Sequence, residues 1–307
     1  MKSMIDYSRE TGYNMGMEYC DAILYRVRRK PKQRRALGKP TSETQAIVNE
    51  RNMKLNFKRV LHANFLEGRD LYVTLTFREG ENPATRSDAK RAADNFWRRV
   101  KRAWEKRGAS VWEIRHNEGK KLPLKYLYVI EGGDGKRIHI HLAMTGGLVW
   151  QEIKVLWGMA DEVNVKILQG SKNGMEALSR YLTKQGGLAK GEHHWYGSRN
   201  LSKPDYGERD NRISRETMEE LADVIEDINA GKGEGVIPTD ERYAPIEERY
   251  PGYYLAEAEA VYVEQFKEWV LHIQLYRQDT EAGKLEKKRR AAELRQIKAR
   301  RAALGAL

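Results

Sequence analysis

Two alternating runs joined by a glycine-rich turn constrain the fold of this chain more than any other feature of its sequence. Residues 126–131 read Tyr-Leu-Tyr-Val-Ile-Glu, residues 137–144 read Arg-Ile-His-Ile-His-Leu-Ala-Met, and Gly-Gly-Asp-Gly lies between them. Strand-like runs this close in sequence predict an antiparallel hairpin, because glycine permits the tight turn. We therefore expect an antiparallel sheet at the centre of the fold.

The segments around this hairpin alternate between strand and helix periods. Residues 71–77 carry an apolar side chain at every second position, which indicates a half-buried strand. The other predicted elements are a helix over 88–106 with Ser87 as its cap, a short helix over 149–157, a strand over 162–168 and a helix over 174–184. This order favours an α+β fold, in which helices cover mainly one face of an antiparallel sheet of ferredoxin-like character.

Charge is distributed unevenly and suggests three parts. Residues 26–39 hold eight basic residues and no acid, whereas residues 216–264 hold 14 acidic and three basic residues. An acidic block repels phosphate, so we place the end of a nucleic-acid-binding part near Ile213. The expected parts are an N-terminal basic arm with a helical extension (1–66), a central α+β domain (67–212) and a mostly helical C-terminal region with an acidic stretch and a basic tail (213–307). In the last part we predict helices over 216–230 and 254–276 and a solvated helix or tail over 284–301.

The overall charge points to a polyanionic partner. The chain has 56 Lys and Arg residues against 44 Asp and Glu, a formal net charge of +12, and nucleic acid is the commonest partner of such proteins. The single cysteine, Cys20, excludes an intramolecular disulfide framework and a zinc cluster of several thiolates. With no long apolar run and no secretion-signal pattern, we expect a cytoplasmic protein that does not bind membranes.

Two histidines on the second strand of the hairpin are the strongest chemical signal. Side chains two residues apart on a strand point the same way, so His139 and His141 share one face. Two such imidazoles form half of a divalent-metal site, and Glu131 at the end of the partner strand can add a carboxylate oxygen. Three protein ligands leave positions open for a substrate, as a catalytic metal requires. The alternative interpretation is a pair of partly exposed strand histidines without a ligand.

A tyrosine and a lysine share one face of the predicted helix over 174–184. Tyr181 and Lys184 are three residues apart, which makes them neighbours on the helix surface. A phenol is a poor nucleophile at its usual pKa of about 10, so Tyr181 would need a nearby cation, which Lys184 or a metal could supply. Taken alone, Tyr181 also fits an aromatic residue at the edge of the core.

Together these segments resemble a known superfamily. In this order, the strand over 71–77, the His139-Ile-His141 strand and the helix with Tyr181-Leu-Thr-Lys184 are similar to the three motifs of the HUH endonucleases. The chain is most similar to the replication initiator (Rep) proteins of rolling-circle plasmids and single-stranded DNA phages, and the resemblance covers about residues 71–203.

The resemblance implies a fold, a reaction and a cofactor. It implies that 67–212 is a nicking domain with the HUH endonuclease fold. In it, Tyr181 would attack a phosphodiester of single-stranded DNA at a replication origin, leaving a 5′-phosphotyrosine link and a free 3′-hydroxyl group. It also implies that His139, His141 and Glu131 bind Mg²⁺ or Mn²⁺.

Two departures from the family pattern bear on partners. Ala177, one helical turn before Tyr181, is not a second tyrosine, so rejoining of the DNA would require another nucleophile or a second subunit, as in a homo-oligomer. The sequence contains no Gly-x₄-Gly-Lys-Ser/Thr motif of an ATP-driven helicase. Unwinding would then fall to a host helicase, and extension of the 3′-hydroxyl to a host polymerase.

Further residues are candidates for contacts with DNA. Positive side chains on the helix over 88–106 can track phosphates, and a segment after Tyr181 can stack on unpaired bases. The candidates are Arg98, Arg99, Lys101, Arg102, Trp195, Tyr196 and Arg199. A solvated helix face and an ordinary surface loop would explain the same residues.

Two other functions fit parts of the sequence. One is a relaxase or a tyrosine-dependent transposase of the same superfamily, although many relaxases place the nucleophile before the histidine pair. The other is a nucleic-acid-binding module of ferredoxin-like fold without catalysis, which would use aromatic residues on exposed strands. Its candidates are Tyr72, Tyr126 and Tyr128.

Overall fold

Two units, each with its own antiparallel sheet, make up the part of the chain that the computed structural model describes. That part comprises residues 6–28, 43–133, 135–169, 193–211, 213–230, 239–264 and 267–304. One unit, here the central unit, lies within residues 44–203, and the other, the terminal unit, combines residues from 1–43 and 204–307. The α+β class is confirmed.

The sheet of the central unit contains the predicted hairpin. Its strands pair in the order β6-β3-β5-β4-β7, and each pair is antiparallel. Their bounds are β3 (Leu71–Leu75), β4 (Tyr126–Gly133), β5 (Lys136–Met144), β6 (Asn164–Ile167) and β7 (Tyr196–Gly197). Glu131 on β4 lies opposite His139 on β5, so strand alternation puts both side chains on one face.

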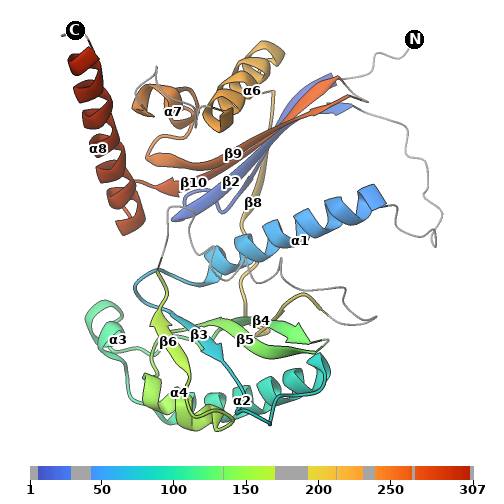
Figure 1. Cartoon of the computed structure of the whole chain (residues 1–307), viewed down its shortest axis with the longest axis vertical. Helices are drawn as coiled ribbons and strands as arrows, with labels where there is room; N and C mark the ends of the chain where they lie inside the picture. The colour runs from blue at the N-terminus through green and yellow to red at the C-terminus, as the bar shows by residue number, and fades with distance from the viewer. Residues whose placement is uncertain are drawn as a thin grey trace. The chain divides into compact units, whose positions relative to one another are not determined.

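Helices cover both faces of this sheet to different extents. The helices are α1 (Glu43–Asn64), α2 (Arg86–Lys106), α3 (Val111–His116) and α4 (Trp150–Trp157). Figure 1 shows α2 and α4 along one face, where Phe96 and Trp157 belong to a core with Ile140. Phe57 and Leu61 of α1 belong to a smaller core on the other face.

The cap of α2 differs from the predicted one. Thr85 is the N-cap, because its hydroxyl accepts a hydrogen bond from the backbone N–H of Asp88. Ser87 lies within the first turn, since the helix already begins at Arg86.

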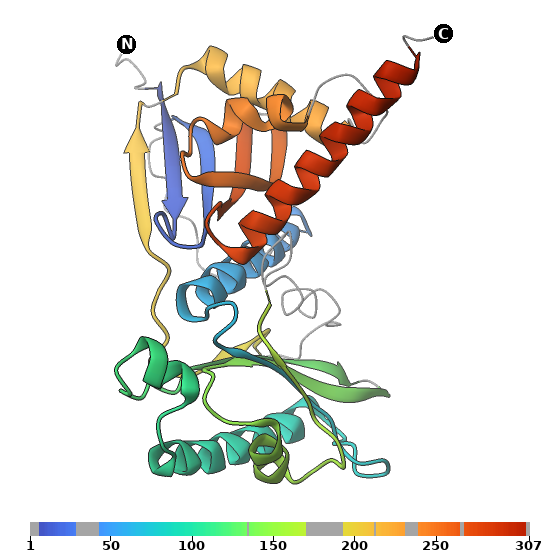
Figure 2. The same ribbon diagram turned by 90° about the vertical axis from the view of Figure 1, so that its left-hand side faces the viewer.

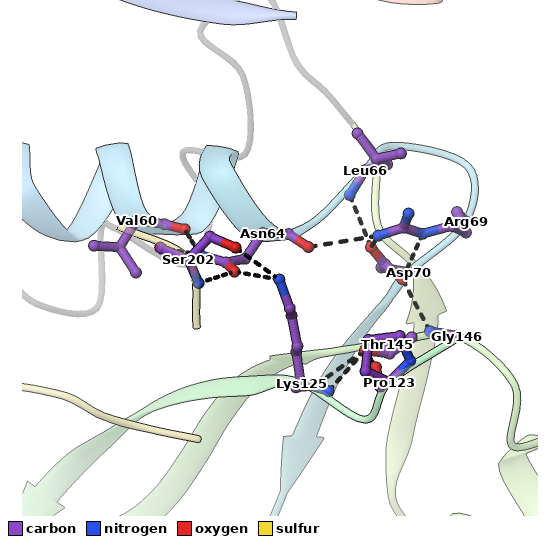
Figure 3. A network of polar contacts seen from close by, with 10 residues as sticks. All are labelled: Val60, Asn64, Leu66, Arg69, Asp70, Pro123, Lys125, Thr145, Gly146 and Ser202. Atoms are coloured by element: carbon purple, nitrogen blue, oxygen red, sulfur yellow. Dashed lines mark hydrogen bonds and ion pairs between the residues drawn. The ribbon is translucent and has the colours of Figure 1, made fainter. Parts of the chain in front are cut away.

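A polar network joins the end of α1 to the sheet of the central unit (Figure 3). The buried Asp70 carboxylate accepts hydrogen bonds from the backbone N–H groups of Leu66, at 2.8 Å, and Gly146, at 3.0 Å. A Cβ atom at Gly146 would lie 1.9 Å from the carbonyl oxygen of Arg69, so this close approach requires glycine. The network thus fixes the turn after β5 against the loop before β3.

The terminal unit is built from both ends of the chain. Its strands are β1 (Asp6–Tyr13), β2 (Tyr19–Arg28), β8 (Tyr206–Asp210), β9 (Tyr253–Val263) and β10 (Glu268–Arg277), and they pair in the order β8-β1-β2-β10-β9. The helices are α6 (Arg215–Ala230), α7 (Thr239–Glu247) and α8 (Glu281–Leu304). Figure 2 shows α6 and α8 beside the sheet. Leu24, Leu271 and Ile225 lie in the core between sheet and helices.

The prediction of a helix over 254–276 is wrong, and the C-terminal region is therefore only in part helical. The segment forms the antiparallel pair β9 and β10. Alanine and glutamate favour helices, but they alternate in β9, so that Ala258 is buried while Glu257 and Glu259 are exposed. Pairing of β10 with both β9 and β2 outweighs the local helix propensity.

The N-terminal part also differs from the prediction. A basic arm and a helical extension are predicted for residues 1–66, and α1 is that helix. However, β1 and β2 precede it, and Cys20, Ala22 and Leu24 alternate as fully buried side chains of β2. Most of the basic stretch over 26–39 lies outside the described residues. Across the described part of the chain, no helix combines the length and the apolar character needed to cross a bilayer.

Candidate functional site

The hairpin histidines open onto a pocket of about 710 Å³ in the central unit. His139 and His141 face this pocket. Ile138 and Ile140, which alternate with them along β5, are fully buried in the core on the opposite face of the sheet. The shared face predicted from strand alternation is therefore present. The pocket is lined by Thr74, Thr76, Glu131, His139, His141, Trp150, Glu162, Val163, Asn164 and Val165.

His141 is held through both ring nitrogens. Its Nε2 lies 2.8 Å from Oε2 of Glu131. Its Nδ1 lies 3.0 Å from the hydroxyl of Tyr72 and 3.2 Å from Oγ1 of Thr74, both on β3. Hydrogen bonds at one nitrogen orient the ring and the other nitrogen, as is typical of metal-binding histidines.

His139 is the more open of the two imidazoles. Its ring centroid lies 6.2 Å from that of His141, and it is partly exposed to the pocket. Burial lowers the pKa of His139, and the neighbouring Arg137 lowers it further, against the opposite effect of Glu131. A lowered pKa favours the neutral imidazole, which is the form that binds metal ions.

The donor atoms suit a divalent cation, although they do not form a complete ligand set as they stand. Glu131 and His141 contact each other directly, and among the described residues no three His, Cys, Asp or Glu side chains converge as metal ligands. Imidazole nitrogen with one carboxylate oxygen is a donor set for a divalent ion with open positions.

The predicted nucleophile lies outside the described residues. Tyr181 and Lys184 fall within 170–192, as does the helix predicted over 174–184. Their positions relative to His139 and His141 are therefore still predictions from sequence.

Three of the predicted DNA contacts lie together. Arg98 and Lys101 of α2 and Arg199 after β7 line a second cleft of about 710 Å³. Its wall includes Tyr126, which stacks on Trp97 with ring centroids 3.7 Å apart. This cleft lies on the side of the sheet that α2 covers, whereas the histidines face the other side.

The remaining basic candidates are placed differently. Arg99 donates hydrogen bonds to the carbonyl oxygens of Leu156, at 2.6 Å, and Trp157, at 3.1 Å, and so it ties α2 to the end of α4. Arg102 is exposed on α2 and does not line the second cleft.

The two aromatic candidates after residue 192 both pack against other aromatic rings of the central unit. Trp195 contacts Phe57 of α1, and Tyr196 stacks on Tyr128. Both are partly buried, so each contributes to packing.

Comparison with known proteins bears on the same region. Residues 70–186 match the family model of the Replication-associated protein ORF2. The replication-associated match includes Glu131, His139 and His141 and extends past Tyr181. It supports a replication initiator family and a role in the start of DNA replication. No curated protein and no solved structure matched the chain.

Thr74 and Trp150 are two of the pocket residues that were not among the candidate ligands, catalytic residues or DNA contacts. Thr74 shares a strand face with Tyr72, which alternation in 71–77 predicts, and it lies beside His141. Trp150 begins α4 and lines the pocket. The helix was predicted, but its sequence does not indicate that the Trp150 side chain lies in the same pocket as the histidines.

Proposed function

We propose that this protein initiates replication by nicking single-stranded DNA at an origin and that it remains joined to the DNA through Tyr181. The observation that supports this most directly is the pocket in which Glu131, His139 and His141 share one face. The pocket lies within the segment that matches the replication-associated family.

A divalent cation bound by His139, His141 and Glu131, Mg²⁺ or Mn²⁺, would polarise the phosphate under attack and stabilise the charge that develops on its oxygens. The chain's own residues prepare this site. Tyr72 and Thr74 fix the ring of His141 so that Nε2 points to Glu131. The neutral form of His139 leaves a nitrogen lone pair free for the cation.

Tyr181 would supply the attacking oxygen. The phenol loses its proton as its oxygen bonds to phosphorus, the bond between phosphorus and the 3′ oxygen breaks, and that oxygen takes up a proton as the 3′-hydroxyl group. Lys184, three residues further along the sequence, would stabilise the phenolate and the charged transition state. These two roles rest on the resemblance in sequence.

The second cleft fits contacts with the same DNA strand. Arg98, Lys101 and Arg199 would neutralise phosphates along a backbone that passes over α2. With one tyrosine in the motif, rejoining would involve a second copy of the chain or another nucleophile. A host helicase and a host polymerase would act in the cytoplasm on the nicked origin.

The interpretation as a non-catalytic module has less support. An RNA-binding sheet of that type presents aromatic rings on an open face, yet Tyr128 is 2% exposed in the core under α2. Tyr126 stacks on Trp97, and the hydroxyl group of Tyr72 forms a hydrogen bond with His141. A relaxase or transposase would share the chemistry proposed here and differ in the DNA element on which it acts.

The test is covalent attachment to DNA. Single-stranded oligonucleotides that tile the DNA around the gene are incubated with the protein and Mn²⁺, and products are separated under denaturing conditions. We expect one oligonucleotide to form an adduct that Tyr181→Phe abolishes and Tyr262→Phe retains, since Tyr262 is an exposed residue of the terminal unit. Binding without any adduct would contradict the proposal.

A further inference from the structure

A tryptophan beside the candidate metal ligands is only partly buried. Trp150, the first residue of α4, lines the same pocket as Glu131, His139 and His141. It is 37% exposed, whereas Ile153 and Trp157, on the same side of α4, are both fully buried. A large aromatic surface is thus left open at the site.

The Trp150 ring is already fixed in orientation. Its Nε1–H donates a hydrogen bond of 2.9 Å to the carbonyl oxygen of Val163. The Nζ atom of Lys154 lies 5.2 Å from the ring centroid and is itself held 3.2 Å from Oε1 of Glu162. A ligand that stacks on this ring would therefore lose little entropy in ordering it.

The chemistry around the ring fits an unpaired nucleotide. Every nucleobase has a π-face that can stack on indole, and a base in single-stranded DNA has that face available. The ammonium group of Lys154 lies next to the ring, and although it is paired with Glu162 it is partly exposed and can also contact a phosphate. The pocket, about 710 Å³, is in the size range of small-molecule sites.

We propose that Trp150 stacks on an unpaired base of single-stranded DNA and thereby holds the adjoining phosphate at His139, His141 and Glu131. This deepens the proposed nicking function and rests on it. The residue would act in binding and positioning the DNA and would take no part in proton transfer or in the attack on phosphorus.

The experiment compares two oligomers of equal length and charge. One is an end-labelled oligothymidylate and the other is the same backbone with abasic sites throughout. Binding is measured by fluorescence polarisation in a Tyr181→Phe background, which cannot form the adduct. We expect Trp150→Ala to weaken oligothymidylate binding on the order of ten-fold and to leave binding of the abasic oligomer unchanged.

Matched variants separate stacking from folding. Trp150→Phe and Trp150→Leu both remove the hydrogen bond to Val163, but only phenylalanine keeps an aromatic face, so phenylalanine should retain most of the affinity and leucine should not. Val155→Ala removes an apolar side chain that is 79% exposed on the same helix and should have no effect. Thermal melting checks that each variant is folded.

The outcomes distinguish this inference from the proposed function. If folded Trp150→Ala or Trp150→Leu binds oligothymidylate as tightly as the background, or if both oligomers lose affinity equally, the stacking role is wrong. Nicking could still be correct, because adduct formation by the parent protein is measured separately. If the parent forms no adduct at Tyr181, the nicking function fails, whatever Trp150 binds.

Discussion

At the scale of single residues, the site depends on how one imidazole is held. Strand alternation in the sequence predicts that His139 and His141 share a face, and this is confirmed because a period of two is imposed by the backbone. The hydroxyl groups that orient His141 come from β3, which pairs with β5 from about 70 residues away. Alternation in 71–77 places Tyr72 and Thr74 on one strand face, but their register against His141 is set by long-range pairing and could not be predicted from sequence.

Removing either histidine should abolish cleavage while largely preserving DNA binding. His139→Ala and His141→Ala each remove one of three candidate ligands, whereas Arg98, Lys101 and Arg199 of the second cleft are untouched. Adduct formation with Mn²⁺ and binding by polarisation are measured side by side. His116→Ala, at an exposed position of α3, is the control. Unchanged nicking in either site variant would remove the metal assignment.

Thr74 should raise the metal affinity of the site without being a ligand itself. Thr74→Val keeps the shape of the side chain but removes the contact with Nδ1 of His141, and loss of such an outer contact lowers metal affinity by about ten-fold or more. Mn²⁺ affinity is measured by titration calorimetry. Thr76→Val is the matched control, because Thr76 lines the same pocket and bonds to the carbonyl oxygen of Glu162 instead. Equal affinities in the two variants would argue against this role.

At the scale of elements, local sequence pattern predicted helices and strands correctly where one face of the element is buried. It gave the wrong element where the amino-acid composition favours a helix but the segment forms a strand. The amphipathic α2 and the hairpin β4–β5 follow their sequence periods, since Phe96 and Ile140 meet in one core. The alanine and glutamate residues of β9 led to the prediction of a helix, because their helix propensity is a local property. Strand pairing instead depends on segments that are distant in the sequence.

The short helix α3 depends on one buried carboxylate. Glu113, fully buried, accepts two hydrogen bonds of 2.6 Å from Arg107 and one of 2.7 Å from the backbone N–H of Ser110. These partners lower its pKa from 4.5 to about 2. The folded state therefore gains stability at pH values above about 4.5, where the unfolded chain also ionises, and loses it as the pH falls towards 2.

Glu113→Gln should reduce the free energy of unfolding by about 3 kcal/mol at pH 7. The difference from the parent should shrink as the pH is lowered from about 4.5 towards 2, because the parent carboxylate is then protonated. Urea unfolding of both proteins at several pH values measures this difference in the free energy of unfolding. Glu118→Gln, at a side chain that is 81% exposed, should change the stability by less than about 0.5 kcal/mol. A difference independent of pH would show that the charge of Glu113 is not what stabilises the fold.

At the scale of the whole molecule, the excess of positive over negative charge lies in residues 44–203. Residues 44–203 hold 29 of the 56 Lys and Arg and only 17 of the 44 Asp and Glu, so they account for the entire net charge of +12. The basic stretches near the two ends are balanced by acidic residues elsewhere in the terminal unit. That unit could not be predicted from sequence, because β2 pairs with β10 across most of the chain.

The central unit should therefore fold and bind DNA by itself. A fragment of residues 44–203 keeps its sheet, its two apolar cores and the network around Asp70, so it should melt cooperatively by circular dichroism. It should bind single-stranded oligonucleotides within about two-fold of the whole chain and with the same slope of affinity against salt, because that slope counts neutralised phosphates. A fragment of 204–307 leaves β10 without β2 and should not fold cooperatively. A smaller salt slope for 44–203 would place some of the phosphate contacts in the terminal unit instead.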